Sequence, residues 1–349
     1  MAKLTLTIND DAAQDDVGEA ATLTNTSVVM GTSSTTIGWA GFRILNVTIP
    51  NAATIRHAYL KVHFGSIGTS ATVQVDLKGE AADNPAAFAA NVNDLSGRTL
   101  TTALVNGADY AIHDHAAGFF FFDVTAIVQE IVNRAGWASG NAMVFMFVSI
   151  SASTIATISF TESANDPELA IIYDGSADSV RSPTVSGTGS YTNPNNAFAS
   201  DNAVATTVNL TSAAQIYESF GIADLAGATI DGILVKVEAR VSSTADRADY
   251  TIELSWDGGT TWTATKSSFQ YDTADITMPY GGADTWGRTF VPSELTNANV
   301  KVRITNSFAA STNDANVDWV NVQVFYTPPS GIPHKTRVYL QAVPRASIY

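Results

Sequence analysis

The sequence lacks cysteine and is poor in basic residues. Among 349 residues there is no Cys, and 18 Lys and Arg stand against 33 Asp and Glu, which gives a formal net charge of −15. The absence of Cys excludes disulfides, thiolate metal sites and thiol nucleophiles. The acidic balance has the wrong sign for a phosphate-binding surface, so we expect no nucleic-acid partner.

Long apolar runs are missing as well. The longest run, at 142–150, is shorter than the about 20 residues that a membrane-spanning helix needs. The N-terminus alternates Leu4, Leu6 and Ile8 with Thr, which is typical of a strand and not of a signal peptide. We therefore expect neither a membrane span nor a secretory leader. The 45% of hydrophobic residues nevertheless indicates a folded chain.

One stretch occurs twice, at 53–62 and at 228–237. In each copy a small residue, Thr and Ile lead into a run of β-branched and other apolar residues, which predicts a turn followed by a long core strand. The chain is also long enough for about two domains of ~150 residues. The sequence therefore predicts an all-β chain of two tandem antiparallel β-sandwich domains of jelly-roll type. We place them at 1–175 and 176–329, followed by a C-terminal extension at 330–349.

A single short helix is predicted in the first domain. Apolar residues recur at helical spacing within 127–132, Asp123 is placed to cap the N-terminus, and Gly136 can end the helix.

The segment Ser255–Trp262 fits the Asp-box pattern Ser-x-Asp-x-Gly-x-Thr-Trp. This pattern predicts a structural hairpin in which Asp257 binds turn amides, Gly258 or Gly259 takes positive φ and Trp262 packs over the turn. Asp boxes repeat through propellers, so the single copy argues against that fold.

Clustered carboxylates occur near the N-terminus, at Asp10, Asp11, Asp15 and Asp16. Ca²⁺ prefers six to eight oxygen ligands, and such a loop could supply several of them. The spacing does not match an EF-hand loop, and charge runs usually lie in water, so we favour a solvated acidic loop.

A second cluster of potential metal ligands is formed by His113, Asp114 and His115. On a strand both imidazoles would share one face and could hold Zn²⁺ or Fe²⁺. No third ligand follows at a diagnostic spacing, so we favour solvated polar residues. The expectation for the whole chain is no metal cofactor, with Ca²⁺ as the alternative.

Catalytic patterns find little support. His57 and His63 are separated by an even number of residues on one predicted strand, hence on one face, but no Ser or carboxylate stands at a telling distance. No Gly-rich phosphate loop precedes a helix. We therefore expect a protein that is not an enzyme.

Several of these segments carry a family resemblance. Residues 43–50, the strand at 53–62, the Asp-Val-Thr helix start, 137–141 and 167–173 together resemble the DNRLRE-type β-sandwich domain. That resemblance implies a fold related to carbohydrate-binding modules, in a family found in surface proteins and phage structural proteins. The segment 227–233 more loosely resembles second-sandwich domains of phage tail and appendage proteins.

The C-terminal extension differs in charge from the rest of the chain. It carries Lys335, Arg337 and Arg345 and no acidic residue, and Val338 and Leu340 would share one face of a strand. One interpretation is a disordered terminus or a last edge strand. The other is an assembly segment that docks on a neighbouring subunit by strand addition, its positive charge meeting an acidic body.

These observations predict a structural protein of a virus particle, at the virion surface or outside the cell. As a capsid decoration, tail or appendage component it would assemble with other virion subunits, as a homo-oligomer. Release by lysis would explain a chain that has an extracellular composition but no export signal. The alternative is a carbohydrate-binding adhesin or receptor-binding module that contacts a cell-surface glycan through Tyr191, Tyr280 or Trp286.

Overall fold

The structure is a computed structural model in which most of the chain is described. The described residues are 2–7, 12–16, 18–24, 27–33, 36–65, 73–106, 118–152, 155–159, 167–174, 176–177, 180–208, 212–222, 225–243, 248–270, 272–283, 286–308 and 313–329.

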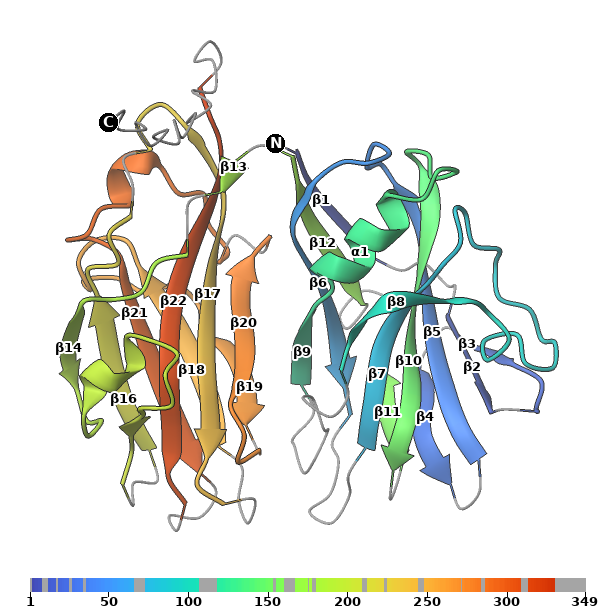
Figure 1. Cartoon of the computed structure of the whole chain (residues 1–349), viewed down its shortest axis with the longest axis horizontal. Helices are drawn as coiled ribbons and strands as arrows, with labels where there is room; N and C mark the ends of the chain where they lie inside the picture. The colour runs from blue at the N-terminus through green and yellow to red at the C-terminus, as the bar shows by residue number, and fades with distance from the viewer. Residues whose placement is uncertain are drawn as a thin grey trace, which may run out of the picture.

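The first part of the chain forms one antiparallel network of 12 strands, with a single helix beside it (Figure 1). The elements are β1 (Ala2–Thr7), β2 (Ala12–Asp16), β3 (Thr22–Thr24), β4 (Ser27–Ser33), β5 (Thr36–Val47), β6 (Ile55–Phe64), β7 (Val73–Glu80), β8 (Leu100–Val105), β9 (Gly118–Asp123), α1 (Thr125–Val132), β10 (Asn141–Ala152), β11 (Ile155–Ser159) and β12 (Glu168–Tyr173).

Aromatic side chains from strands that are not paired meet inside this network. Phe64 of β6 and Phe147 of β10 meet edge to face with ring centroids 6.0 Å apart, although β6 and β10 are not hydrogen-bonded neighbours. Phe122 of β9 meets Phe147 in the same way at 5.4 Å. Side chains of strands that are not paired can meet only across the space between two layers. The network is therefore folded into facing layers that share a core.

Helix α1 follows β9 directly and closes one end of that core. Its four buried side chains are Ile127, Val128, Ile131 and Val132. The predicted ends differ from the observed ones. The cap position is Val124, and the Asp123 carboxylate instead accepts a hydrogen bond from the Thr125 amide, 3.1 Å away. The helix ends at Val132, several residues before Gly136, since the next residues form a tight turn.

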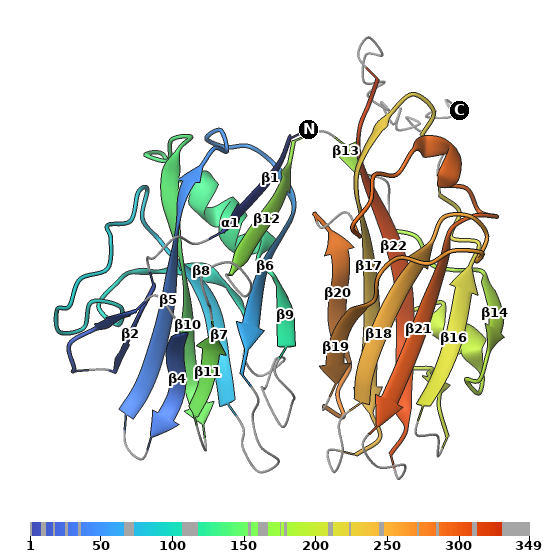
Figure 2. The same cartoon turned by 180° about the vertical axis from the view of Figure 1, so that it is seen from behind.

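The second part of the chain forms two five-stranded antiparallel sheets that face each other (Figure 2). Its elements are β13 (Ser176–Ala177), β14 (Val185–Gly189), η1 (Pro194–Ala197), β15 (Ala205–Thr206), β16 (Ser212–Glu218), β17 (Thr229–Val241), β18 (Ala248–Ser255), β19 (Lys266–Gln270), β20 (Ile276–Gly282), η2 (Pro292–Glu294), β21 (Lys301–Phe308) and β22 (Ala315–Thr327).

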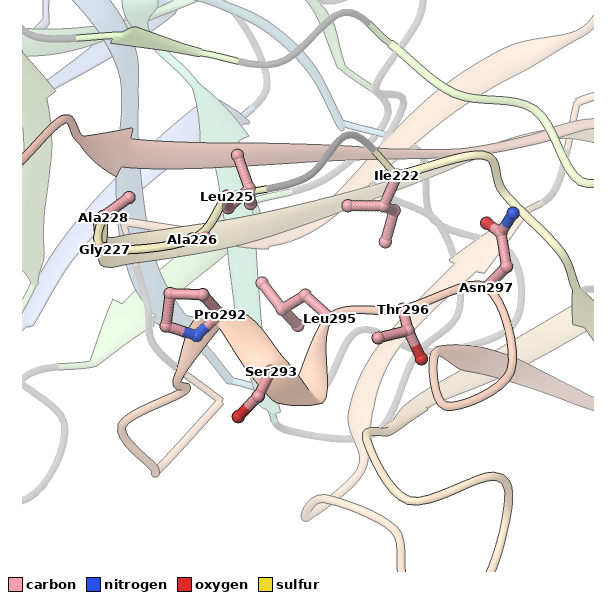
Figure 3. A pocket seen from close by; sticks show the side chains of 10 residues that line it. All are labelled: Ile222, Leu225, Ala226, Gly227, Ala228, Pro292, Ser293, Leu295, Thr296 and Asn297. Carbon is pink, nitrogen blue, oxygen red and sulfur yellow. The ribbon is translucent and has the colours of Figure 1, made fainter. Parts of the chain in front are cut away.

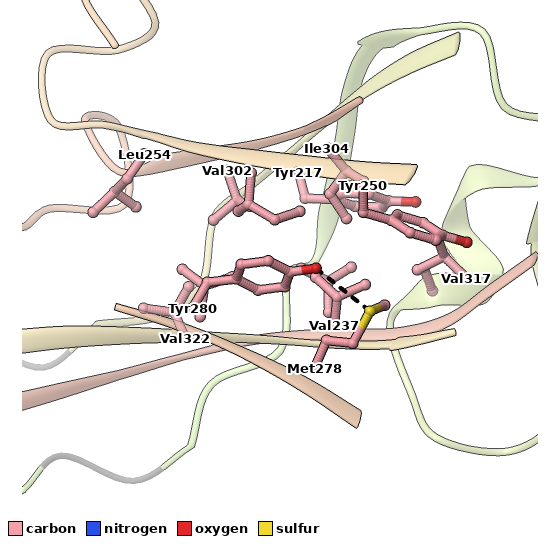
Figure 4. Packing of buried hydrophobic residues seen from close by; sticks show 14 of the residues in the cluster. Tyr217, Val237, Tyr250, Leu254, Met278, Tyr280, Val302, Ile304, Val317 and Val322 are labelled. Carbon is pink, nitrogen blue, oxygen red and sulfur yellow. Dashed lines mark hydrogen bonds between the residues drawn. The ribbon is translucent and has the colours of Figure 1, made fainter. Parts of the chain in front are cut away.

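Alternating apolar residues of the long strands fill the space between these sheets. The longest pairing joins β17 and β22, and on the facing sheet β21 alternates buried and half-buried side chains along its whole length. Tyr217, Tyr250 and Tyr280 lie among valines between the two layers (Figure 4). Both repeated stretches are therefore core strands, β6 in the first part and β17 in the second. The all-β sandwich prediction is confirmed.

No helix in the described part of the chain combines the length and the apolar character that a membrane crossing requires.

Candidate functional site

The Asp-box residues form the loop that joins β18 to β19. The Asp257 carboxylate accepts hydrogen bonds from the amides of Thr260 and Thr261, at 3.1 and 2.9 Å. The Ser255 hydroxyl accepts one from the Gly259 amide at 2.8 Å. These bonds hold the pKa of Asp257 below its usual value, the contacts with Thr261 contributing most.

Trp262 closes this loop from the other side. Its Nε1 donates to the Gly259 carbonyl at 3.2 Å, and Gly259 has a φ of +96°, a conformation that suits glycine. The Arg303 guanidinium lies 4.2 Å from the centre of the indole ring. Trp262 remains half-buried, so part of its ring reaches the surface.

The three aromatic residues predicted to contact a glycan are buried, so that prediction is corrected. Tyr191, Tyr280 and Trp286 are 6%, 2% and 3% exposed and belong to the core of the second part. The Tyr191 hydroxyl donates to Asn306 Oδ1 at 2.9 Å, and Trp286 Nε1 donates to the Ile233 carbonyl at 2.7 Å. Tyrosine and tryptophan can satisfy their polar atoms inside a core, which is why sequence alone does not separate the two environments.

The remaining predicted site residues lie largely outside the described residues. This holds for Asp10 and Asp11, for His113, Asp114 and His115, and for the assembly residues Lys335, Arg337, Val338, Leu340 and Arg345. The backbone of Asp15 and Asp16 belongs to β2, which pairs with β5, and their side chains are not described. Within the described ranges, no three Asp, Glu or His side chains gather closely enough to hold a metal ion.

An apolar cluster joins the two parts of the chain, and we call it the junction. It consists of Tyr59, Ala170, Ile172, Leu234, Ala283 and Phe325, with Phe121 packed beside them. On the first part the contributing strands are β6 and β12, and on the second β17 and β22. These strands are neighbours within each sheet, so each part presents a continuous apolar face.

His57 lies at the centre of the junction. Its ring is 2% exposed and stacks on Phe325 with centroids 5.8 Å apart and planes inclined by 26°. The Ala283 amide donates to His57 Nδ1 at 3.4 Å, which leaves the proton of the neutral ring on Nε2, a buried atom without a hydrogen-bond partner. Burial lowers the pKa of His57 to about 4, so the ring is neutral at pH 7.

One ion pair crosses the edge of the junction. Lys236 Nζ of β17 lies 3.7 Å from Asp123 Oδ2 at the end of β9. Partial burial raises the pKa of Asp123, but His57, the Thr125 hydrogen bonds and Lys236 together outweigh that effect and hold it below its ordinary value. Asp123 is therefore ionised at neutral pH. It links the start of α1 in the first part of the chain to strand β17 in the second part.

Sequence reasoning placed His57 on a strand but did not find the junction. A usable signal was present in runs such as 169–172 and 233–235, where consecutive residues are all apolar. A strand with one face in water alternates polar and apolar residues, whereas an unbroken apolar run indicates burial on both faces. Such a run does not reveal which surface covers the second face.

Two of the pockets are lined entirely by described residues. The first, which we call the end pocket, has a volume of about 720 Å³ and lies between the β16–β17 and β20–β21 connections. Its walls include Ile222 and Leu225 on one side and Pro292 and Leu295 on the other (Figure 3). The second, the side pocket, has about 580 Å³ and lies beside the N-terminus of α1, where Asp123 is part of its wall.

Comparisons with known proteins give only distant similarities. No family model matches the sequence, and no curated protein matches it, so the DNRLRE-type resemblance stays a prediction. Among solved structures, the tandem CBM22 domains of Xyn10C from Paenibacillus barcinonensis are 8% identical, with a TM-score of 0.24 over 92% of this chain and 96% of that one.

Two viral structures show similar values. Broad bean stain virus gives 10% identity and a TM-score of 0.23 over 95% of this chain and 91% of that chain. The structure of infectious bursal disease virus, Gt strain, gives 10% identity and a TM-score of 0.21 over 95% of this chain and 75% of that chain. At these values the function has to be argued from the geometry of the chain itself.

Proposed function

We propose that the chain is a non-enzymatic structural protein of a virus particle, displayed at its surface, which works by assembly with further copies and other virion subunits. The observation that carries this proposal is the junction. Six apolar side chains and a buried His bind the two sandwiches directly to each other. Direct packing fixes the orientation of two domains, which a building block needs and a flexibly tethered binding module does not.

The two pockets also favour a role without catalysis. None of the residues that line the end pocket has an ionisable side chain. Among the residues that line the side pocket, Asp123 alone is ionisable, and it already binds the Thr125 amide and Lys236. A general acid or base needs a titratable group that faces the substrate, and the linings of these two pockets supply none beyond that engaged carboxylate.

The alternative is a carbohydrate-binding module, and one observation favours it. Trp262 keeps part of its ring exposed in a surface loop that several hydrogen bonds hold in place. A rigidly held indole is a suitable platform for the apolar face of a sugar ring. Tyr191, Tyr280 and Trp286 do not contribute, because they are buried.

Light scattering after size-exclusion chromatography, over a hundredfold range of protein concentration, separates the two functions. An assembling protein gives a discrete oligomer or a polymer whose mass rises with concentration, and negative-stain microscopy shows its form. A monomer at every concentration that binds an immobilised glycan, and loses that binding in the Trp262→Ala variant, would replace the assembly proposal by the alternative.

A further inference from the structure

The end pocket lies where the described chain ends. Thr327, the last residue of β22, pairs with Thr229 at the start of β17, and the chain continues to Pro329. A Cβ added at Gly227, in the pocket wall, would lie 3.4 Å from Cγ of Pro329. The pyrrolidine ring therefore lies against the rim of the pocket, and residues 330–349 begin there.

The pocket is lined mainly by apolar residues, together with the polar Ser293, Thr296 and Asn297, and its walls are held in place. Leu225 and Leu295, from the two connections, are 6% and 3% exposed and join the core below. The Gly221 amide donates to Asn297 Oδ1 at 2.6 Å, which ties one wall to the other. In the β16–β17 connection, Ala228 N donates to the Leu225 carbonyl at 2.9 Å in a tight turn. The cavity is thus preformed and does not depend on a bound partner for its shape.

The chain itself offers a suitable occupant. Ser330 and Gly331 follow Pro329, and the next residues are Ile332 and Pro333, two apolar side chains without charge. Glycine permits the reversal of direction that a return to the pocket requires. Three residues of extended chain span about 10 Å, which is enough to cross the rim.

We propose that the end pocket is the docking site of the chain's own C-terminal segment, with Ile332 and Pro333 inserted between the two connections. A segment tethered by two residues has an effective concentration in the millimolar range, so it competes well against a second copy or a free ligand at lower concentration. Once docked, the segment carries Lys335 and Arg337 over a body whose charge is strongly negative. This inference concerns the chain in isolation and does not depend on the proposed role in a particle.

Engineered cysteines test the proposal directly, because the chain has none of its own. Ser293 is an exposed residue in the pocket wall, and the double variant S293C/I332C in the full chain places one thiol in the pocket and one in the segment. Disulfides form only when the two Cα atoms approach within about 7 Å. Under mild oxidation we expect an intramolecular disulfide in most molecules, seen by non-reducing electrophoresis and peptide mass spectrometry.

The matched control is T273C/I332C. Thr273 is exposed and lies next to Asp272, which binds Val241 at the far end of β17, about 40 Å from the start of that strand. We expect at least tenfold less cross-linking in this pair. Equal yields in the two variants would overturn the proposal. So would an intermolecular disulfide in S293C/I332C, which would instead place the segment of a second copy in the pocket.

A second measurement avoids any covalent trap. Ala226 is an exposed part of the pocket wall, so a larger side chain there can fill the cavity without entering the core. In the full chain, A226W should raise the amide exchange rates of residues 332–340 at least tenfold and leave those of β17 unchanged. If the rates in the segment do not change, the segment is not docked in this pocket and the proposal fails.

Discussion

Acid should weaken the junction through His57, and the size of the effect can be worked out. In the folded chain burial holds the pKa of His57 at about 4, whereas the ordinary value is 6.5. Between these two pH values the unfolded chain binds a proton at His57 and the folded chain does not, so stability falls as the pH falls through this window. The full difference corresponds to about 3 kcal/mol, reached below pH 4.

The groups that face His57 do not reverse this sign. Asp123 on β9 favours the protonated ring, and Lys236 on β17 opposes it, but burial is the largest effect. The lowered pKa of Asp123 adds loss of stability in the same direction, because its carboxylate has to be protonated at still lower pH.

The assay is urea unfolding followed by tryptophan fluorescence at several pH values from 7 to 4. H57F keeps a ring against Phe325 and removes the titratable group. Between pH 7 and pH 4 its free energy of unfolding should therefore fall by about 3 kcal/mol less than that of the unaltered chain. The carboxylates other than Asp123, whose pKa depends on His57 itself, contribute equally to both proteins and cancel in the difference. H63F is the control, because His63 lies on the same strand but outside the junction cluster, and it should change the slope less. Equal pH slopes for H57F and the unaltered chain would refute the reasoning.

Three further predictions concern named positions. G282A should destabilise the chain by roughly 1–3 kcal/mol more than G287A in urea unfolding, because both glycines have positive φ but only at Gly282 would a Cβ collide with His57; equal losses would mean that the collision is relieved. F325A should lower the free energy of unfolding by about 3 kcal/mol and raise the radius of gyration in small-angle scattering, since it removes the large Phe side chain from the junction. An unchanged radius would show that the remaining junction contacts are enough to hold the two parts together. D257A should accelerate amide exchange at 259–262 with little change in the strands, because the Asp257 carboxylate accepts hydrogen bonds from loop amides. Unchanged exchange rates would show that these hydrogen bonds do not hold the loop in place.

The two long strands predicted from the repeated stretches at 53–62 and 228–237 are present as β6 and β17. Burial on one face is also visible in β21, where Val302 and Ile304 alternate with Lys301 and Arg303 in the sequence and every second side chain is buried. Helix α1 was predicted from its spacing, but its ends were not, because the Asp123 side chain binds the first helical amide without occupying the cap position. Cap geometry depends on backbone angles that residue type only biases.

The candidate site was harder to predict than the fold. Tyr280 and Trp286 belong to a core that sequence could not assign to them, because both residue types occur at surfaces and in interiors. The junction was missed for another reason. Its residues come from β6, β12, β17, β22 and the residue after β20, and only the folded chain shows that two apolar faces meet. The side-chain pattern of a strand gives its burial but not its partner.

Double-sided burial in β17 limits how the chain can be divided. Val235 points into the core of its own sandwich, and its neighbour Leu234 points into the junction. A cut in the short connection between Tyr173 and Ser176 would therefore leave an uncovered apolar face on each product, the kind of surface that promotes aggregation. The two halves should therefore be expressed together as one protein, since either half alone would expose its apolar junction face to solvent.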